Sequence, residues 1–158
     1  MNRVLGVGLI VSNIALLNAS PVRAQGMVVE TEECVNAIAS VENQLVTDRQ
    51  LTLEMSEINV RNASGTPPEG RPRQYAFGMS GSAVEAVMSS GVLLDNLATQ
   101  IIDNCNSISS VRFAQWGSGW FWVFGLMPNG EVEFFECPED HFHGGGYRDL
   151  VWGESCPT

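Results

Sequence analysis

The chain contains no lysine, and all eight of its basic residues are arginines. This absence excludes the phosphate-binding lysine of a P-loop, a Schiff-base lysine and a Ser–Lys dyad, because each of these needs an ε-amino group. The G-x-S-x-G elbow of serine hydrolases is missing too, since Gly78-Met79-Ser80-Gly81 is followed by Ser82. No motif predicts a catalytic centre, and we therefore expect a protein that is not an enzyme.

Positive charge is scarce throughout the sequence. Eight basic residues stand against 18 acidic ones, which gives a formal net charge of −10 at pH 7. A chain this acidic repels phosphate backbones and anionic membrane surfaces. The composition therefore argues against a nucleic-acid partner.

The sequence also lacks a hydrophobic run of the length that crosses a bilayer. The longest apolar stretch, from Val4 to Leu17, has about 14 residues, whereas a spanning helix needs about 20. Arg3 precedes this stretch, and Val22 and Ala24 occupy the small-residue positions that a signal peptidase recognises. We predict that residues 1–24 are a signal peptide cleaved before Gln25, and that the exported protein has no stable membrane insertion.

Four cysteines follow the predicted cleavage site, at Cys34, Cys105, Cys137 and Cys156. An even number in an exported chain indicates two disulfides, for which three pairings exist. The alternative is a zinc site, but the chain has no C-x-x-C pair. We expect a single acidic, disulfide-stabilised domain over residues 25–158, periplasmic or extracellular, of the kind common among small exported bacterial proteins.

Two segments have the periodicity of helices. Residues 31–48 place apolar side chains at helical spacing behind Thr31, a plausible N-cap. Residues 82–104 carry the clearest apolar stripe in the chain, although Ser89-Ser90-Gly91 could break or kink it. Residues 50–61 are compatible with a strand or with a continuing helix.

The remaining elements are predicted strands. Tyr75, Phe77 and Met79 alternate with smaller residues, after a loop at 62–72 that contains an N-glycosylation sequon at Asn62. Residues 108–116, 120–127 and 131–137 form a predicted β-meander, whose last turn is the hairpin sequence Asn129-Gly130. Four meander residues should face the core: Val111, Phe113, Val132 and Phe134.

These elements predict an α+β fold with two helices packed on one face of an antiparallel sheet. An antiparallel helix pair brings Cys34, at the start of the first helix, next to Cys105, at the end of the second. In the meander, Cys105 and Cys137 are separated by roughly 25 Å, far beyond the reach of a disulfide of about 7 Å. We therefore predict the pairs Cys34–Cys105 and Cys137–Cys156.

The segment 137–156 holds both histidines of the chain. His141 and His143 point the same way if extended, and Glu139 and Asp149 lie nearby in sequence. Imidazole with carboxylate suits a divalent transition metal, so these four residues are a candidate metal site. The alternative is a solvated loop in which the three glycines only provide slack.

Aromatic side chains are concentrated in the strand 120–127. It is apolar on both faces, and the four tryptophans Trp116, Trp120, Trp122 and Trp152 could form a platform for a glycan or a protein partner. The alternative, which we favour, is burial of this strand inside the sheet. For function we expect a non-enzymatic binding or interaction module that uses the 137–156 loop and the neighbouring aromatic residues. A metal-binding protein or metal-dependent enzyme that uses His141 and His143, and a structural envelope component, are the alternatives.

Overall fold

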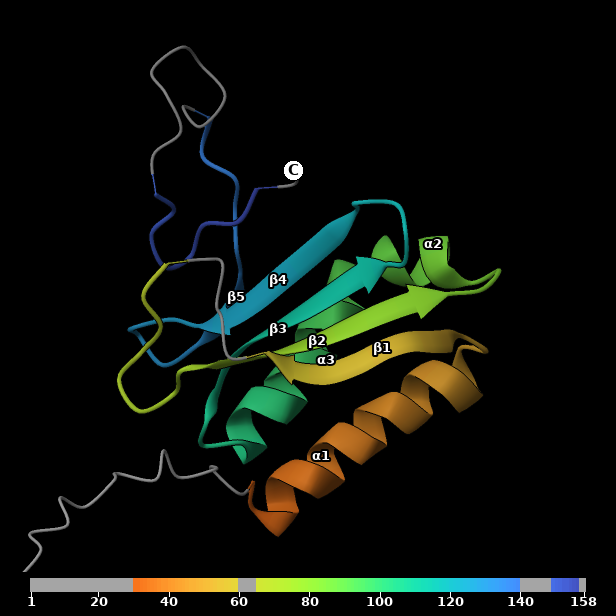
Figure 1. Ribbon diagram of the computed structural model, residues 1–158, viewed down its shortest axis with the longest axis horizontal. Coiled ribbons are helices and arrows are strands. Elements are labelled where there is room, and N and C mark those ends of the chain that lie inside the picture. Colours follow the sequence, from red (N-terminus) through yellow and green to blue (C-terminus); the bar gives the residue numbers. More distant parts are fainter. Residues whose placement is uncertain (1–29, 60–64, 140–148, 157–158) are drawn as a thin grey trace, which may run out of the picture.

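The computed structural model describes residues 30–59, 65–139 and 149–156 (Figure 1). The predicted signal peptide, the Asn62 sequon and both histidines lie outside these ranges. The described elements follow one another along the chain as α1 (Glu32–Asn43), the π-helical turn η1 (Gln44–Asp48), β1 (Thr52–Asn59), β2 (Arg73–Ser80), α2 (Val84–Met88), α3 (Gly91–Asn104), β3 (Ile108–Gln115), β4 (Phe121–Leu126) and β5 (Val132–Phe134).

The five strands form one sheet in the order of the sequence, β1-β2-β3-β4-β5. Neighbouring strands are antiparallel except β2 and β3, which run parallel. A parallel pair needs a long crossover connection, and here α2 and α3 supply it. The α+β fold and the C-terminal meander are thus confirmed, in a sheet that is mixed where we had expected only antiparallel pairs.

Side-chain capping and a break in the chain determine where the helices begin and end. The hydroxyl of Thr31 accepts a hydrogen bond from the Cys34 amide at 3.3 Å, and this N-cap starts α1. The expected long second helix is divided, because α2 ends at Met88 and α3 begins at Gly91. The segment that could have been strand or helix is the edge strand β1.

A single apolar core lies between the helices and one face of the sheet, which we call the helix-side face. Figure 1 shows α1 and α3 on the same side of the strands. Phe77 of β2 and Phe113 of β3 are fully buried there, and their rings stack with centroids 5.4 Å apart. Val41 of α1 and Ile101 of α3 close the core from the helix side.

The opposite, second face of the sheet is covered at one end by the C-terminal tail. Phe135 is buried there and packs edge-on against Trp152, with ring centroids 4.9 Å apart. The indole N–H of Trp152 donates to the Leu126 carbonyl at 2.9 Å. Gly125 is required beneath this pair, because a Cβ at that position would collide with the Phe135 ring.

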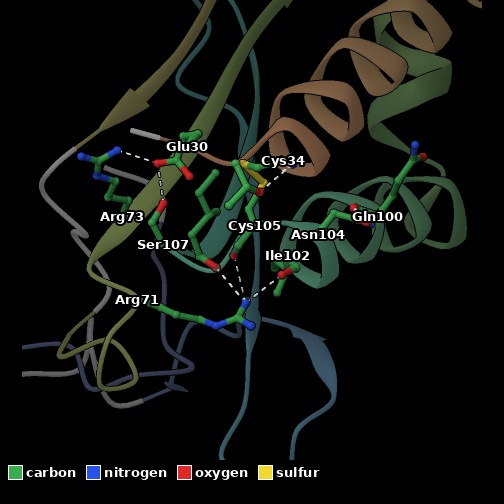
Figure 2. The surroundings of a disulfide bond; sticks show 11 residues. Glu30, Cys34, Arg71, Arg73, Gln100, Ile102, Asn104, Cys105 and Ser107 are labelled. Carbon is green, nitrogen blue, oxygen red and sulfur yellow. Dashed lines mark hydrogen bonds and ion pairs between the residues drawn. A yellow bond between two sulfur atoms is a disulfide. The ribbon is translucent and has the colours of Figure 1, made fainter. Parts of the chain in front are cut away.

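Both predicted disulfides are confirmed. Cys34–Cys105 joins the start of α1 to the end of α3, and Cys137–Cys156 ties the tail to the end of the meander. Figure 2 shows the first bridge together with Arg71, whose Nη1 donates to the carbonyls of Ile102, Cys105 and Ile108 at 2.7, 3.2 and 3.3 Å. The bridge and this arginine therefore fix the C-terminal end of α3.

Candidate ligand-binding groove

A groove of about 590 Å³ lies between the break that separates α2 from α3 and the helix-side face of the last two strands. Figure 1 shows α2 and the turn between β3 and β4 at the same end of the sheet. The groove is lined by the end of α2, the first turns of α3 and the helix-side face of β4 and β5, through Met88, Ser89, Gly91, Val92, Asp95, Trp120, Trp122, Phe124 and Phe134. Its volume is in the range of small-molecule sites.

The aromatic rings of the groove form a continuous edge-to-face chain. Trp122 contacts Trp120 at 6.1 Å and Phe134 at 5.2 Å between ring centroids, and Phe124 contacts Phe134 at 5.6 Å. The indole N–H of Trp122 donates to the Met88 carbonyl at 2.8 Å, which locks this ring and leaves its N–H unavailable to a ligand. The wall is therefore rigid and presents π surfaces to a ligand.

Asp95 is the charged side chain in the lining of this groove. It is partly buried, and it forms no hydrogen bond or ion pair with any residue that the structure describes. Ser89, at the end of α2, adds the one hydroxyl of the lining. The groove thus combines an extensive apolar wall with an uncompensated negative charge.

The four predicted surface tryptophans do not form one platform. Trp120 and Trp122 line the groove, whereas Trp152 packs on Phe135 on the second face. Trp116 is 54% exposed and its ring lies over Gly78, on the second face as well. The strand β4 is therefore only partly buried, and it does not form a single aromatic platform, because its two faces contact different neighbours.

Sequence reasoning missed several groove residues. Phe134 was expected to face the core, and it does lie on the helix-side face, but it is 40% exposed in the edge strand β5. Val92, at the start of α3, is 78% exposed, which is unusual for a valine. The position of this apolar residue between Gly91 and Asp95 is the one sequence feature that could have indicated the groove.

The candidate metal site stays a prediction. Glu139 and Asp149 are both exposed, and His141 and His143 lie outside the described residues. Within residues 30–59, 65–139 and 149–156, no group of three or more His, Cys, Asp or Glu side chains is arranged to hold a metal ion.

A second polar cluster joins α1 to the first two strands. The Ser56 hydroxyl donates to the Glu42 carboxylate at 2.5 Å, and the Tyr75 hydroxyl contacts both, at 3.0 and 3.2 Å. Burial, reinforced by the charge of Glu42, raises the pKa of Tyr75 to about 12, although the Ser56 hydrogen bond acts in the opposite direction. The tyrosine is therefore neutral at physiological pH, and the three side chains connect α1, β1 and β2 through hydrogen bonds.

Comparison with known proteins adds no homologue to this picture: no protein-family model matches the chain, and no curated protein or solved structure is significantly similar to it. Among the described helices, none is long and apolar enough to cross a membrane. The two disulfides indicate a non-reducing compartment.

Proposed function

We propose that the protein is an exported, non-enzymatic binding module, periplasmic or extracellular, whose groove binds an apolar organic cation. The observation that carries this proposal is the pairing of four aromatic rings with the unpartnered carboxylate of Asp95 in one groove. The apolar run at residues 4–17 and the two disulfides support export.

A cation fits this lining better than a neutral or anionic ligand does. Aromatic faces attract a positive charge through their quadrupole, and the attraction is strongest for the indole of tryptophan. Asp95 adds a direct charge interaction, and the net charge of −10 draws cations toward the protein. An anion would be repelled by the aromatic faces and by Asp95, and the described lining has no basic residue to offset this repulsion.

A glycan is supported less well by the same residues. Sugar rings stack on tryptophan, but they also need several hydrogen-bonding partners for their hydroxyl groups. Ser89, Asp95 and the indole N–H of Trp120 are the polar side-chain groups of the lining that remain for a ligand, because the Trp122 N–H already donates to Met88. The groove would therefore leave most sugar hydroxyls without partners.

The test compares two probes of the same shape, phenyltrimethylammonium and its neutral isostere tert-butylbenzene. Calorimetry or tryptophan fluorescence should detect binding of the cation to the purified mature domain, and the neutral probe should bind more weakly. Asp95→Asn should weaken the affinity for the cation by roughly five- to tenfold and leave the affinity for the neutral probe unchanged. The matched control Asp103→Asn removes the same charge from an exposed site on α3 and should have little effect.

A blocking variant tests the location of the site. Val92→Arg places a long cationic side chain at the exposed rim of the groove and should abolish binding of phenyltrimethylammonium, while unfolding stays unchanged. Val35→Arg introduces the same charge at an exposed position on α1 and is the control. Equal binding of the two probes, or equal effects of the two arginine variants, would disprove the proposal.

A further inference from the structure

The second face of the sheet carries an arginine that has no acidic partner among the residues that the structure describes. Arg112, in the middle of β3, lies beside Ala76 of β2 and Val123 of β4 on this face. Its guanidinium carbon is 4.0 Å from the centre of the Phe121 ring. Its Nε is shut off from solvent and has no hydrogen-bond partner, and neither Nη atom donates to a residue that the structure describes.

This arrangement is unusual for a protein with more than twice as many acidic as basic residues. Arg112 is half-buried, which lowers the pKa of its guanidinium, and no carboxylate among the described residues forms an ion pair with it. Glu57 is on the same face, two strands away across Ala76, and makes no bond to Arg112. The two Nη atoms, unlike Nε, are not shut off from solvent, and they have no partner among the described residues, so they are the donors that a ligand can reach.

A hollow of about 190 Å³ lies next to this guanidinium, between Arg112 and the turn that joins β3 to β4. Its lining includes Met55, Gly78, Ala114 and Trp116, together with Trp120, which also borders the groove. A Cβ on Gly78 would lie 2.7 Å from the Trp116 ring, so the glycine allows the indole to lie against the sheet. The other surface of the indole is open, since Trp116 is 54% exposed.

We propose that this hollow is a second binding site, which takes a small flat ligand carrying one carboxylate. The two Nη atoms of Arg112 present parallel N–H donors, a geometry that matches the two oxygens of a carboxylate. The flat body of the ligand stacks on Trp116, and the volume is sufficient for a single aromatic ring.

One guanidinium compensates one negative charge. A phosphate or phosphonate dianion would bring a second charge that no other basic residue lining the hollow could offset, into a strongly acidic protein. The ligand is therefore a monocarboxylate. This inference does not depend on the proposed function of the groove, because the two sites use different charges on opposite faces of the sheet.

The experiment uses benzoate, neutral benzamide and phenylphosphonate as probes of the purified mature domain, with ligand-observed NMR or calorimetry as the readout. Benzoate should bind most tightly. Arg112→Gln should reduce the affinity for benzoate at least about tenfold. Arg112→Lys should reduce it less, because lysine keeps the positive charge but lacks the two parallel N–H donors. Arg49→Gln removes an equal charge from an exposed position and is the matched control.

A second variant keeps the test decisive if the Arg112 variants do not fold. Trp116→Ala alters an exposed side chain and should weaken benzoate roughly fivefold while the domain remains folded. Three results would each overturn the proposal: benzamide binding as tightly as benzoate, phenylphosphonate binding more tightly, or Arg49→Gln and Arg112→Gln having the same effect.

Discussion

At several positions in this protein, contacts with one or two neighbouring side chains determine which residue fits or affect its pKa. Gly78 and Gly125 illustrate this on the second face, where each makes room for an aromatic ring that a Cβ would displace. On the helix-side face, Tyr75 is 5% exposed and depends on Ser56 and Glu42 for its hydrogen bonds. Burial is the main cause of the raised pKa of this tyrosine, and Glu42 reinforces it while the Ser56 hydrogen bond opposes it.

The raised pKa of Tyr75 has a consequence for stability at alkaline pH. Because the pKa is about 12 in the folded protein and about 10 in the unfolded chain, the folded state holds the proton more tightly. This contribution to the free energy of unfolding is complete below about pH 10 and is lost as the pH rises from about 10 to about 12. Denaturation midpoints measured across that interval should fall in the wild type.

Tyr75→Phe should flatten this fall, since it removes the group that titrates. Tyr147 is the second tyrosine of the chain and lies outside the described residues, so Tyr147→Phe is the control and should retain the wild-type profile. Ultraviolet absorbance of tyrosinate in the Tyr147→Phe variant reports the titration of Tyr75 alone. Titration near pH 10 in the folded protein would contradict the assignment.

The helices α2 and α3 are held in position by contacts at their ends. The break after Met88 lets α2 and α3 take different directions, and the carbonyl of Met88 then receives the Trp122 N–H. At its other end, α3 stops at the Cys34–Cys105 bridge. Arg71, from the loop before β2, takes the place of the C-terminal glycine that many helices use.

Arg71→Ala should therefore destabilise the domain by about 1.5–3 kcal/mol, because three carbonyl groups lose a charged donor. Urea unfolding followed by tryptophan fluorescence gives the free energy of unfolding. Arg71→Lys should recover part of the loss, since an ammonium can satisfy some of these carbonyls. Arg49→Ala, at an exposed site, should change the free energy by less than about 0.5 kcal/mol. Equal costs for Arg71→Ala and Arg49→Ala would exclude the capping role.

The whole molecule is held together by two disulfides of different reach. Cys34–Cys105 closes a loop with a sequence separation of 71, and Cys137–Cys156 closes one of 19. The first joins the two long helices over the main core. The second secures the tail, whose Trp152 covers one end of the second face.

Loop-closure entropy predicts a contribution of about 4 kcal/mol from the first bridge and about 3 kcal/mol from the second. The variant Cys34→Ala/Cys105→Ala should lower the urea midpoint more than Cys137→Ala/Cys156→Ala. Hydrogen exchange should show loss of protection mainly in the tail of the latter variant, which should still bind phenyltrimethylammonium. A larger global loss from Cys137→Ala/Cys156→Ala would mean that the tail belongs to the main folding unit.

Local chemistry in the sequence was sufficient for much of this fold. Apolar periodicity located the helical and meander segments, Asn129-Gly130 located the last hairpin, and the directions of the elements gave both disulfide pairs. The same periodicity assigned Phe134 to the helix-side face. These features depend on residues close together in the chain, or on an element's direction alone.

The binding sites were decided by the tertiary structure. The sheet order places Phe134 in the edge strand β5, and the packing of α3 on β4 and β5 brings Phe134 and Trp122 to the same groove as Asp95. Likewise, Arg112 is set apart from any carboxylate only by the neighbours that the sheet register gives it. Periodicity specifies the face on which a side chain lies, but what covers that face is determined by packing between segments distant in sequence.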